Sequence, residues 1–334
     1  MVAHRLSGRP LLGNRLDAGL FTGRRRQLEH ARRALLDRLN TVITGEPGAG
    51  RTSTLHAVLA ELTVPHVLIR GAPVLDAGDL LRRVVADLQV RAGTGAGLPD
   101  LGASGDVVDR IGVLRQLAGA IDALVIAVDD VPPEVGMDLF GRYRDELWSI
   151  DAAWLVTVTT AHAPLVLRPP ADVFFDVRID LPALSDTEAA DLLDKRIGGA
   201  TDRLGIDRVI SVAAGNPRRL IALARQLVSG DQGEFAAAAD AGRRRSGLLA
   251  GMTAASRMLA GELEALGGAS ASDPALLARL GWTRPRAVQV LKELEAAGLV
   301  VATDERRGKG RPRKVYRLSA EPDITAEPDI SAET

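Results

Sequence analysis

A glycine-rich stretch constrains the fold of this chain more than any other feature. An apolar run at residues 41–44 precedes it and a segment with helical periodicity at 55–62 follows, so its context is strand, glycine turn and helix. In such a turn successive N–H groups point into one concavity, and the start of the next helix attracts phosphate. The stretch therefore predicts a phosphate-binding loop, and its nucleotide-contacting residues are Gly45, Glu46, Pro47, Gly48, Ala49, Gly50, Arg51, Thr52 and Ser53.

Two positions of this loop carry its chemistry. Thr52 stands where a hydroxyl would bind the Mg²⁺ that accompanies a nucleoside triphosphate. Arg51 replaces the lysine that such loops use, and a planar guanidinium is not equivalent to a compact ammonium group. We expect nucleotide and Mg²⁺ to bind here, whereas hydrolysis, for which Arg51 would be a catalytic residue, remains open.

Length and composition narrow the class of protein. The 334 residues are enough for two or three domains, and 46% apolar with 25% charged residues is typical of soluble globular proteins. The absence of cysteine excludes disulfides, thiolate nucleophiles and cysteine-ligated zinc. The longest apolar run, 123–128, is too short to span a bilayer. We therefore expect a cytoplasmic protein that does not contact membranes.

The segments around the loop predict an α/β sheet. Apolar runs at 64–70, 124–130, 154–160 and 173–179 are expected to be strands. Uninterrupted apolar strands are buried on both faces, which is typical of a parallel sheet between helices. A helix over 25–39 precedes the loop, and it either packs over the nucleotide base or is an ordinary solvated basic helix.

Polar side chains close two of these strands, at the edge where ligands bind in parallel sheets. Asp129 would hold the Mg²⁺ through water, and Asp130 would orient or activate the attacking water. Thr159 or Thr160 could contact the terminal phosphate or this water, although threonine is common in strands. These residues are the candidate metal and catalytic groups.

After residue 183 the pattern becomes helical. Ser185 and Glu188 have the spacing of a capping box, and residues 215–217 have the glycine, asparagine and proline that punctuate helices. Punctuation does not explain Arg218, which could reach the phosphates from a small helical lid. Arg168 is a candidate for an arginine that reaches a neighbouring subunit's nucleotide, although most surface arginines have no such role.

The C-terminal part predicts a winged helix-turn-helix, with helices at 252–266, 273–280 and 284–297 and strands at 299–301 and 315–318. Residues 279–317 carry eleven basic against four acidic residues, which favours nucleic acid as a partner. On the third helix Arg286, Gln289 and Glu293 share the exposed face and could read bases, and Arg284 is a further predicted DNA contact. The predicted phosphate contacts of the wing are Arg307, Lys309, Arg311, Arg313 and Lys314. The alternative is a protein-binding module with a solvated basic loop.

With these parts in order, the chain resembles the AAA+ ATPases of the origin-recognition and initiator clade and the related STAND signalling ATPases. The matching pieces are residues 21–24, the phosphate loop, Asp129-Asp130, the strand ending at Thr160, residues 184–188 and 215–218, and the winged helix. The resemblance implies a five-stranded parallel P-loop sheet with nucleotide between it and the helical lid. It also implies that Thr159 or Thr160 is the first sensor and Arg218 the second, and that homo-oligomers are possible.

Three departures from these relatives bear on activity. Arg51 replaces lysine, Asp130 stands where many relatives have glutamate, and residues 25–27 lack the usual acidic residues. The first two point toward slow hydrolysis, and hence toward a nucleotide-gated switch rather than a motor. The expected domains are a flexible basic arm (1–19), an ATPase domain (20–183), a lid (184–247), a winged helix (248–318) and a disordered acidic tail (319–334).

Two functional hypotheses follow. The first is a regulator that binds ATP or ADP with Mg²⁺, binds DNA, and has weak ATPase activity. The second is a signalling or scaffold ATPase whose winged helix binds protein, with degenerate or purely structural nucleotide binding.

Overall fold

The computed structural model describes residues 6–14, 17, 19–71, 73–92, 106–197, 203–229, 244–245, 247–249, 251–305 and 313–319. These residues form two compact units. The first extends over Gly8–Ala183, and the second holds the described residues from Leu184 onward together with Leu6 and Ser7. In the described parts of the chain, none of the helices combines the length and the apolar character needed to cross a membrane.

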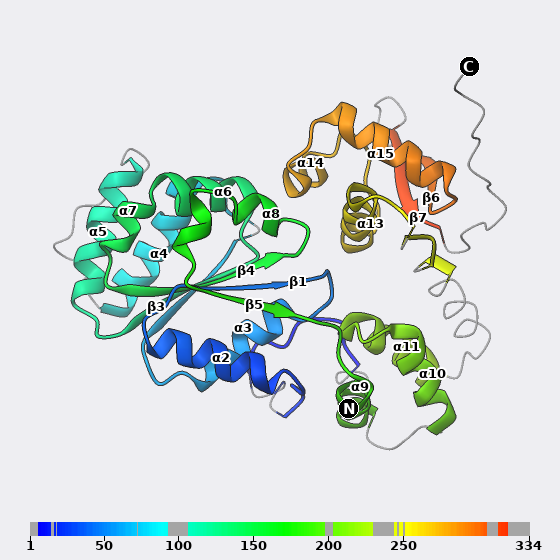
Figure 1. The fold of residues 1–334 in the computed structure, drawn as a ribbon, viewed down its shortest axis with the longest axis horizontal. Helices are drawn as coiled ribbons and strands as arrows, with labels where there is room; N and C mark the ends of the chain where they lie inside the picture. The colour runs from blue at the N-terminus through cyan, green and yellow to red at the C-terminus, as the bar shows by residue number, and fades with distance from the viewer. Residues whose placement is uncertain are drawn as a thin grey trace. The chain divides into compact units, whose positions relative to one another are not determined.

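The first unit is built on a five-stranded sheet in the order β2-β3-β4-β1-β5, and every neighbouring pair is parallel (Figure 1). Its strands are β1 (Thr41–Gly45), β2 (His66–Arg70), β3 (Leu124–Asp129), β4 (Ala152–Thr159) and β5 (Val177–Leu181). Residues of β1, β3 and β4 are buried almost throughout, as expected where helices cover both faces. The predicted α/β fold with a parallel sheet is confirmed.

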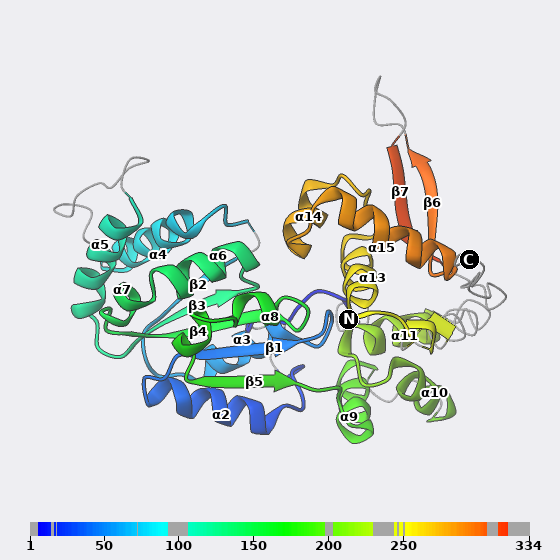
Figure 2. The same cartoon turned by 45° about the horizontal axis from the view of Figure 1, so that its top comes forward.

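Helices cover both faces of this sheet (Figures 1 and 2). Alternate residues of the strands point into two separate cores. Ile126 faces a core closed by helices on one side, whereas Val125 and Ala127 face the core on the other. The first core is covered by α4 (Ala77–Ala92), α5 (Val107–Gly119), α6 (Pro133–Met137), η1 (Asp138–Arg142), α7 (Arg144–Trp148) and α8 (Ala163–Val166). The second is covered by α2 (Arg25–Leu36) and α3 (Arg51–Glu61).

The fifth strand begins later than predicted. Residues Ala171–Phe174 form the short 3-10 helix η2, and only Val177–Leu181 joins the sheet. The ring of Phe174 stacks on Phe140 with centroids 4.9 Å apart and is completely buried. Burial of this aromatic ring, rather than β-propensity, decides the local conformation, so the strand predicted over 173–179 is wrong for its first part.

The described part of the predicted flexible arm is packed rather than loose. Leu11 is buried, and its N–H donates to the Ser53 hydroxyl on α3 at 3.0 Å. Asp17 is also buried, where it accepts from the N–H of Leu12 at 2.7 Å and pairs with Arg9. These contacts place the arm beside the helix that follows the glycine loop.

In the second unit, α9 (Asp186–Ile197), α10 (Arg203–Ala213) and α11 (Pro217–Ser229) share one core, which Leu6 joins. The capping box is confirmed, because the Glu188 N–H donates to Ser185 Oγ at 3.2 Å and the Ser185 N–H donates to Glu188 at 3.0 Å. Asn216 begins α11 rather than ending α10, since its side-chain oxygen accepts from the N–H of Arg218 at 3.1 Å.

The unit continues with α13 (Ala254–Leu266), α14 (Pro274–Leu280), α15 (Arg284–Ala296) and the antiparallel pair β6 (Val300–Glu305) and β7 (Arg313–Leu318). Leu276 and Leu280 pack in one core with Val290, Leu291 and Leu294. The predicted wing contacts Arg307, Lys309 and Arg311 lie outside the described residues, as do the residues after Ser319.

Candidate nucleotide site

The glycine loop has the geometry that its sequence predicts. It follows β1 and opens α3, with Gly48 at φ 85° and Gly50 at φ 94°, a region that other residues enter only with strain. The Ala49 N–H donates to the Glu46 carbonyl at 2.9 Å, and α3 starts with a bond from the Thr54 N–H to the Gly50 carbonyl at 2.8 Å. The first N–H groups of α3 thus face the loop, as a phosphate site requires.

Arg51 turns back onto the loop that precedes it. Its Nη1 donates to the carbonyl oxygens of Gly45 at 2.6 Å and Glu46 at 3.1 Å, and its Nη2 donates to Asp130 Oδ1 at 3.1 Å. The side chain is only 13% exposed, and its buried Nε has no hydrogen-bond partner among the described residues. The guanidinium therefore lies inside the site rather than in solvent.

Asp129 is held by two hydroxyl groups. Thr157, on the neighbouring strand β4, donates to Asp129 Oδ1 at 2.8 Å, and the Thr52 side chain also hydrogen-bonds to this carboxylate. Burial raises the pKa of Asp129 above its ordinary value, and the bonds from Thr157 and Thr52 counteract that rise in part. The Thr52 hydroxyl and the Asp129 carboxylate are thereby brought together, as predicted for the metal site.

This donor set fits Mg²⁺ that arrives with a nucleotide. Among the described residues no group of three or more His, Asp or Glu side chains could hold a metal ion alone. Mg²⁺ commonly binds through one or two carboxylates, with phosphate and water completing its octahedron. Thr52 and Asp129 would hold such an ion, whose charge would also favour the ionised form of the buried carboxylate.

Asp130 lies in a tight corner beside this pair. Its backbone adopts a left-handed conformation with φ 60°, and its N–H donates to the Thr157 hydroxyl at 2.7 Å. A Cβ at Gly71 would come within 2.6 Å of the Asp130 carbonyl oxygen, so only glycine fits there. The Asp130 carboxylate contacts Arg51, and its predicted action on water stays a prediction.

The two candidate sensor threonines differ in their surroundings. Thr159 is buried and its hydroxyl accepts from the His162 N–H at 3.1 Å. Thr160 is exposed, and its N–H donates to the Gly45 carbonyl at 3.1 Å, next to the glycine loop. The structure thus brings Thr160 to the loop and leaves Thr159 inside the protein.

Sequence reasoning missed two residues of this site. Thr157 is fully buried and bridges Asp129 and Asp130. Because threonine is common in strands, its position in the sequence did not indicate this role. Arg24 is buried at φ 61° and its Nη2 lies 3.4 Å from the Ala49 carbonyl. The resemblance to AAA+ ATPases includes residues 21–24, but it did not predict that the Arg24 side chain reaches the glycine loop.

The predicted roles of two arginines stay predictions. Arg218 is exposed at the start of α11 in the second unit, so its approach to the phosphates stays a prediction. Arg168 is exposed in the first unit, between α8 and η2, and its role toward a neighbouring subunit is likewise untested.

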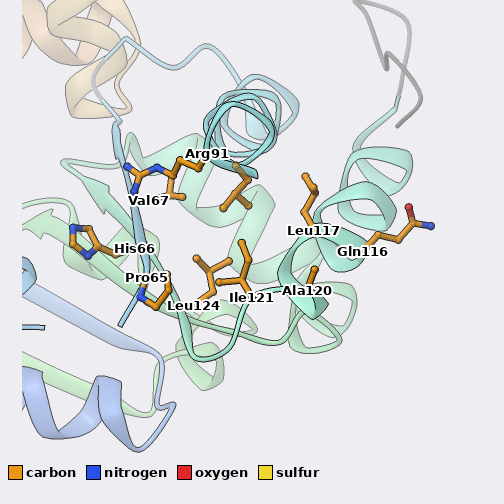
Figure 3. Close-up of a pocket in the computed structure, with 10 residues that line it drawn as sticks. Pro65, His66, Val67, Arg91, Gln116, Leu117, Ala120, Ile121 and Leu124 are labelled. Atoms are coloured by element: carbon orange, nitrogen blue, oxygen red, sulfur yellow. The ribbon is translucent and has the colours of Figure 1, made fainter. Parts of the chain in front are cut away.

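A separate cavity of about 550 Å³ lies at the opposite edge of the sheet, where β2 and β3 begin (Figure 3). Its lining is mainly apolar, with Leu88, Leu117 and Leu124 among its residues, and Gln116 extends away from it. Arg91 at its rim pairs with Asp87 at 2.7 Å. None of the predicted site residues lines this cavity.

On α15, Arg284, Arg286 and Gln289 are exposed, as predicted. The Arg286 guanidinium lies 5.7 Å from the Trp282 ring centroid and donates to Gln289 Oε1 at 2.9 Å. Lys292 is also exposed, which adds a cation to this helix. Glu293 is half-buried and accepts from the Ser256 hydroxyl at 3.1 Å, so its predicted place on the exposed face is wrong.

The two predicted wing contacts that lie among the described residues have carboxylate partners. Arg313 lies 3.4 Å from Asp273 Oδ2 and donates to the Ser270 hydroxyl. Lys314 Nζ lies 3.2 Å from Glu295 Oε1, and this bond raises the pKa of Lys314. Both side chains thus join β7 to helices of the same unit.

Comparisons with known proteins show which fold this is. No protein-family model and no curated protein sequence matches the chain. Orc1 of Aeropyrum pernix in complex with DNA is 17% identical, with 96% of each chain covered and a TM-score of 0.53. A Walker-type ATPase of Pyrococcus abyssi is 14% identical over 95% of this chain and 97% of that one, with a TM-score of 0.55. Cdc6p of Pyrobaculum aerophilum is 15% identical over 91% and 93%, with a TM-score of 0.51. The chain therefore has the fold of these solved Orc1, Cdc6p and Walker-type ATPase structures.

Proposed function

We propose that this protein is a nucleotide-gated regulator that binds ATP and DNA and hydrolyses ATP slowly. The observation that carries the proposal is the convergence of the glycine loop, the Thr52 hydroxyl and the Asp129 carboxylate at one edge of the parallel sheet. In this proposal residues 45–53 bind the phosphates, while Thr52 and Asp129 hold Mg²⁺. Residues 184–247 act as a lid from which Arg218 reaches the nucleotide.

Slow hydrolysis has two physical reasons. A guanidinium at position 51 is larger than an ammonium group and takes part in hydrogen bonds to Gly45, Glu46 and Asp130. Asp130 is also one methylene shorter than the glutamate that many relatives have, so its carboxylate reaches less far toward an attacking water. A bound nucleotide would therefore persist long enough to set the state of the protein.

The DNA-binding part of the proposal concerns residues 248–318 as a winged helix. Its support is the helix order α13, α14 and α15 before a hairpin, together with the exposed Arg284, Arg286, Gln289 and Lys292 on α15. One solved structure of this fold, Orc1 of Aeropyrum pernix, is a complex with DNA. In this proposal α15 enters a major groove and the wing contacts phosphates.

A specific observation favours a second candidate function, in which the winged helix binds a protein. Arg313 and Lys314 are paired with Asp273 and Glu295, which reduces the positive charge available for a DNA backbone. The chain would then be a signalling or scaffold ATPase, and its basic residues would stabilise the hairpin.

DNA affinity measured with and without Mg²⁺·ATP tests the proposal. The wild-type chain should bind duplex DNA with an affinity that falls steeply with salt and changes on adding Mg²⁺·ATP. Thr52→Ala should retain DNA binding and lose the nucleotide effect, whereas Arg286→Glu should lose DNA binding. Arg26→Glu, which changes an exposed arginine of the first unit, is the matched control. Absence of salt-dependent DNA binding would leave the second candidate.

A further inference from the structure

The Arg51 guanidinium divides its hydrogen bonds between two kinds of partner. Nη1 is bonded to the backbone of the glycine loop, through the carbonyl oxygens of Gly45 and Glu46. Nη2 is bonded to the carboxylate of Asp130, which stands after β3 on a different part of the chain. Nη1 thus binds the loop, and Nη2 binds an acidic side chain in the site proposed for phosphate.

We propose that the Arg51–Asp130 ion pair is a latch that opposes the entry of nucleotide. It rests on the proposed nucleotide function and adds a form of regulation to it. An entering phosphate replaces the Asp130 carboxylate on Nη2, while Nη1 remains on the loop carbonyls. Because carboxylate and phosphate oxygens accept from a guanidinium in the same geometry, the exchange needs no rebuilding of the loop.

The surroundings of both residues suit a latch. Arg51 is 13% exposed and Asp130 31% exposed, so the pair is partly shielded from water and screened less than a surface pair. The Gly45 carbonyl also accepts from the Thr160 N–H at 3.1 Å, which fixes the acceptor at the base of the guanidinium. The Asp130 N–H donates to the Thr157 hydroxyl at 2.7 Å, and its carboxylate accepts from Arg51 Nη2 at 3.1 Å.

Opening the latch has a chemical consequence. While paired, the Asp130 carboxylate neutralises Arg51 and is itself occupied by a cation. Once phosphate replaces it, the carboxylate is released to interact with water beside the nucleotide. Nucleotide entry and release of the acidic side chain thereby become one event, and ligands without a phosphate that reaches Arg51 leave the latch closed.

The test uses the full chain with Asp130→Asn, Arg51→Met and the double variant. Asparagine tolerates the left-handed backbone of Asp130, so the first variant should fold. The latch predicts that Asp130→Asn tightens Mg²⁺·ATP binding by about fivefold, which corresponds to the interaction free energy of a partly exposed ion pair. In the Arg51→Met background the same substitution should change the affinity by less than about twofold. Asp180→Asn, which removes a β5 carboxylate bonded to Thr44, is the matched control and should change affinity by less than about twofold.

A second readout separates the latch from the proposed function. Without nucleotide, the effects of Arg51→Met and Asp130→Asn on the unfolding midpoint should be non-additive, because each removes the same pair. Additive effects would overturn the latch regardless of any binding result. Non-additive effects with unchanged or weaker ATP binding by Asp130→Asn would show a pair that does not oppose nucleotide. If none of the proteins binds ATP, the proposed nucleotide function fails, and the latch as its regulator fails with it.

Discussion

Thr157 and Asp129 lie on neighbouring strands, and the Thr157 hydroxyl donates to Asp129 Oδ1 at 2.8 Å. The same hydroxyl accepts from the Asp130 N–H at 2.7 Å, so one fully buried oxygen positions both acidic residues of the site. The separation of their roles, one toward Thr52 and the other toward Arg51, depends on this hydroxyl.

Replacing this hydroxyl should therefore disturb the metal site. Thr157→Val leaves a buried carboxylate and a buried N–H without their shared partner, which should cost about 1–3 kcal/mol of unfolding free energy. Mg²⁺-dependent ATP binding should weaken as well, and Thr157→Ser should restore both. Urea unfolding and calorimetry at several Mg²⁺ concentrations measure the two effects. Equal stability and affinity in Thr157→Val would show that the bridge has no such role.

The raised pKa of Asp129 makes a prediction about pH. Because burial raises this pKa above the ordinary 3.8, the folded protein binds the proton more tightly than the unfolded chain does. The resulting stabilisation is complete below the unfolded pKa and is lost as pH rises through the folded value. Without nucleotide or metal, Asp129→Asn should thus gain stability relative to wild type as pH rises above about 4. Urea unfolding between pH 4 and 7 checks this, and a constant difference would contradict it.

Gly71 should resist substitution because of Asp130. A Cβ at Gly71 would lie 2.6 Å from the Asp130 carbonyl oxygen, and the atoms that it would meet all belong to the backbone. Gly71→Ala should therefore cost more than about 2 kcal/mol of unfolding free energy. Gly112→Ala, inside α5 with no atom within 4 Å of the new Cβ, is the control and should be neutral or stabilise by about 0.5–1 kcal/mol. Thermal unfolding compares them, and similar midpoints would refute the close approach.

Substitutions of two arginines in the second unit should have different effects, one on stability and the other on DNA binding. Arg313→Ala removes a pairing with Asp273 and Ser270 and should lower stability by about 1 kcal/mol. Arg286→Ala should leave stability nearly unchanged and weaken DNA binding by about 1–3 kcal/mol if the side chain reads a base. Chemical unfolding and a DNA titration at fixed salt give both values. The opposite assignment of effects would mean that the hairpin, not α15, contacts DNA.

Much of the fold could be predicted because the hydrophobic periodicity agrees along the chain with the residues that begin and end helices and strands. The uninterrupted apolar run of β3 and the glycines at 48 and 50 specify a strand and a loop locally, and local rules sufficed to predict them. Phe174 shows where such rules fail, because its conformation depends on Phe140, more than thirty residues earlier in the sequence. Local rules also fail for Glu293. Its position on the helix predicted exposure, but its carboxylate accepts a hydrogen bond from Ser256 on α13.

The site was predictable at the level of motifs and not at the level of contacts. Thr52 and Asp129 came together as their motifs indicated. The bond from Arg51 to Asp130 joins residues 79 positions apart, and only the parallel order of β3, β4 and β1 brings them into reach. The role of Thr157 likewise depends on the register between β3 and β4, which a single sequence does not encode in any local pattern.

In the proposed function, the glycine loop with Arg51 binds nucleotide and restrains its hydrolysis. Calorimetry of Mg²⁺·ATP binding by the wild-type chain and by Arg51→Lys, with phosphate release followed in parallel, tests this most directly. We predict that both proteins bind ATP, that the wild-type chain hydrolyses it very slowly, and that Arg51→Lys hydrolyses it faster. Failure of both proteins to bind ATP would contradict the account, and the function would then have to reside in the C-terminal helices alone.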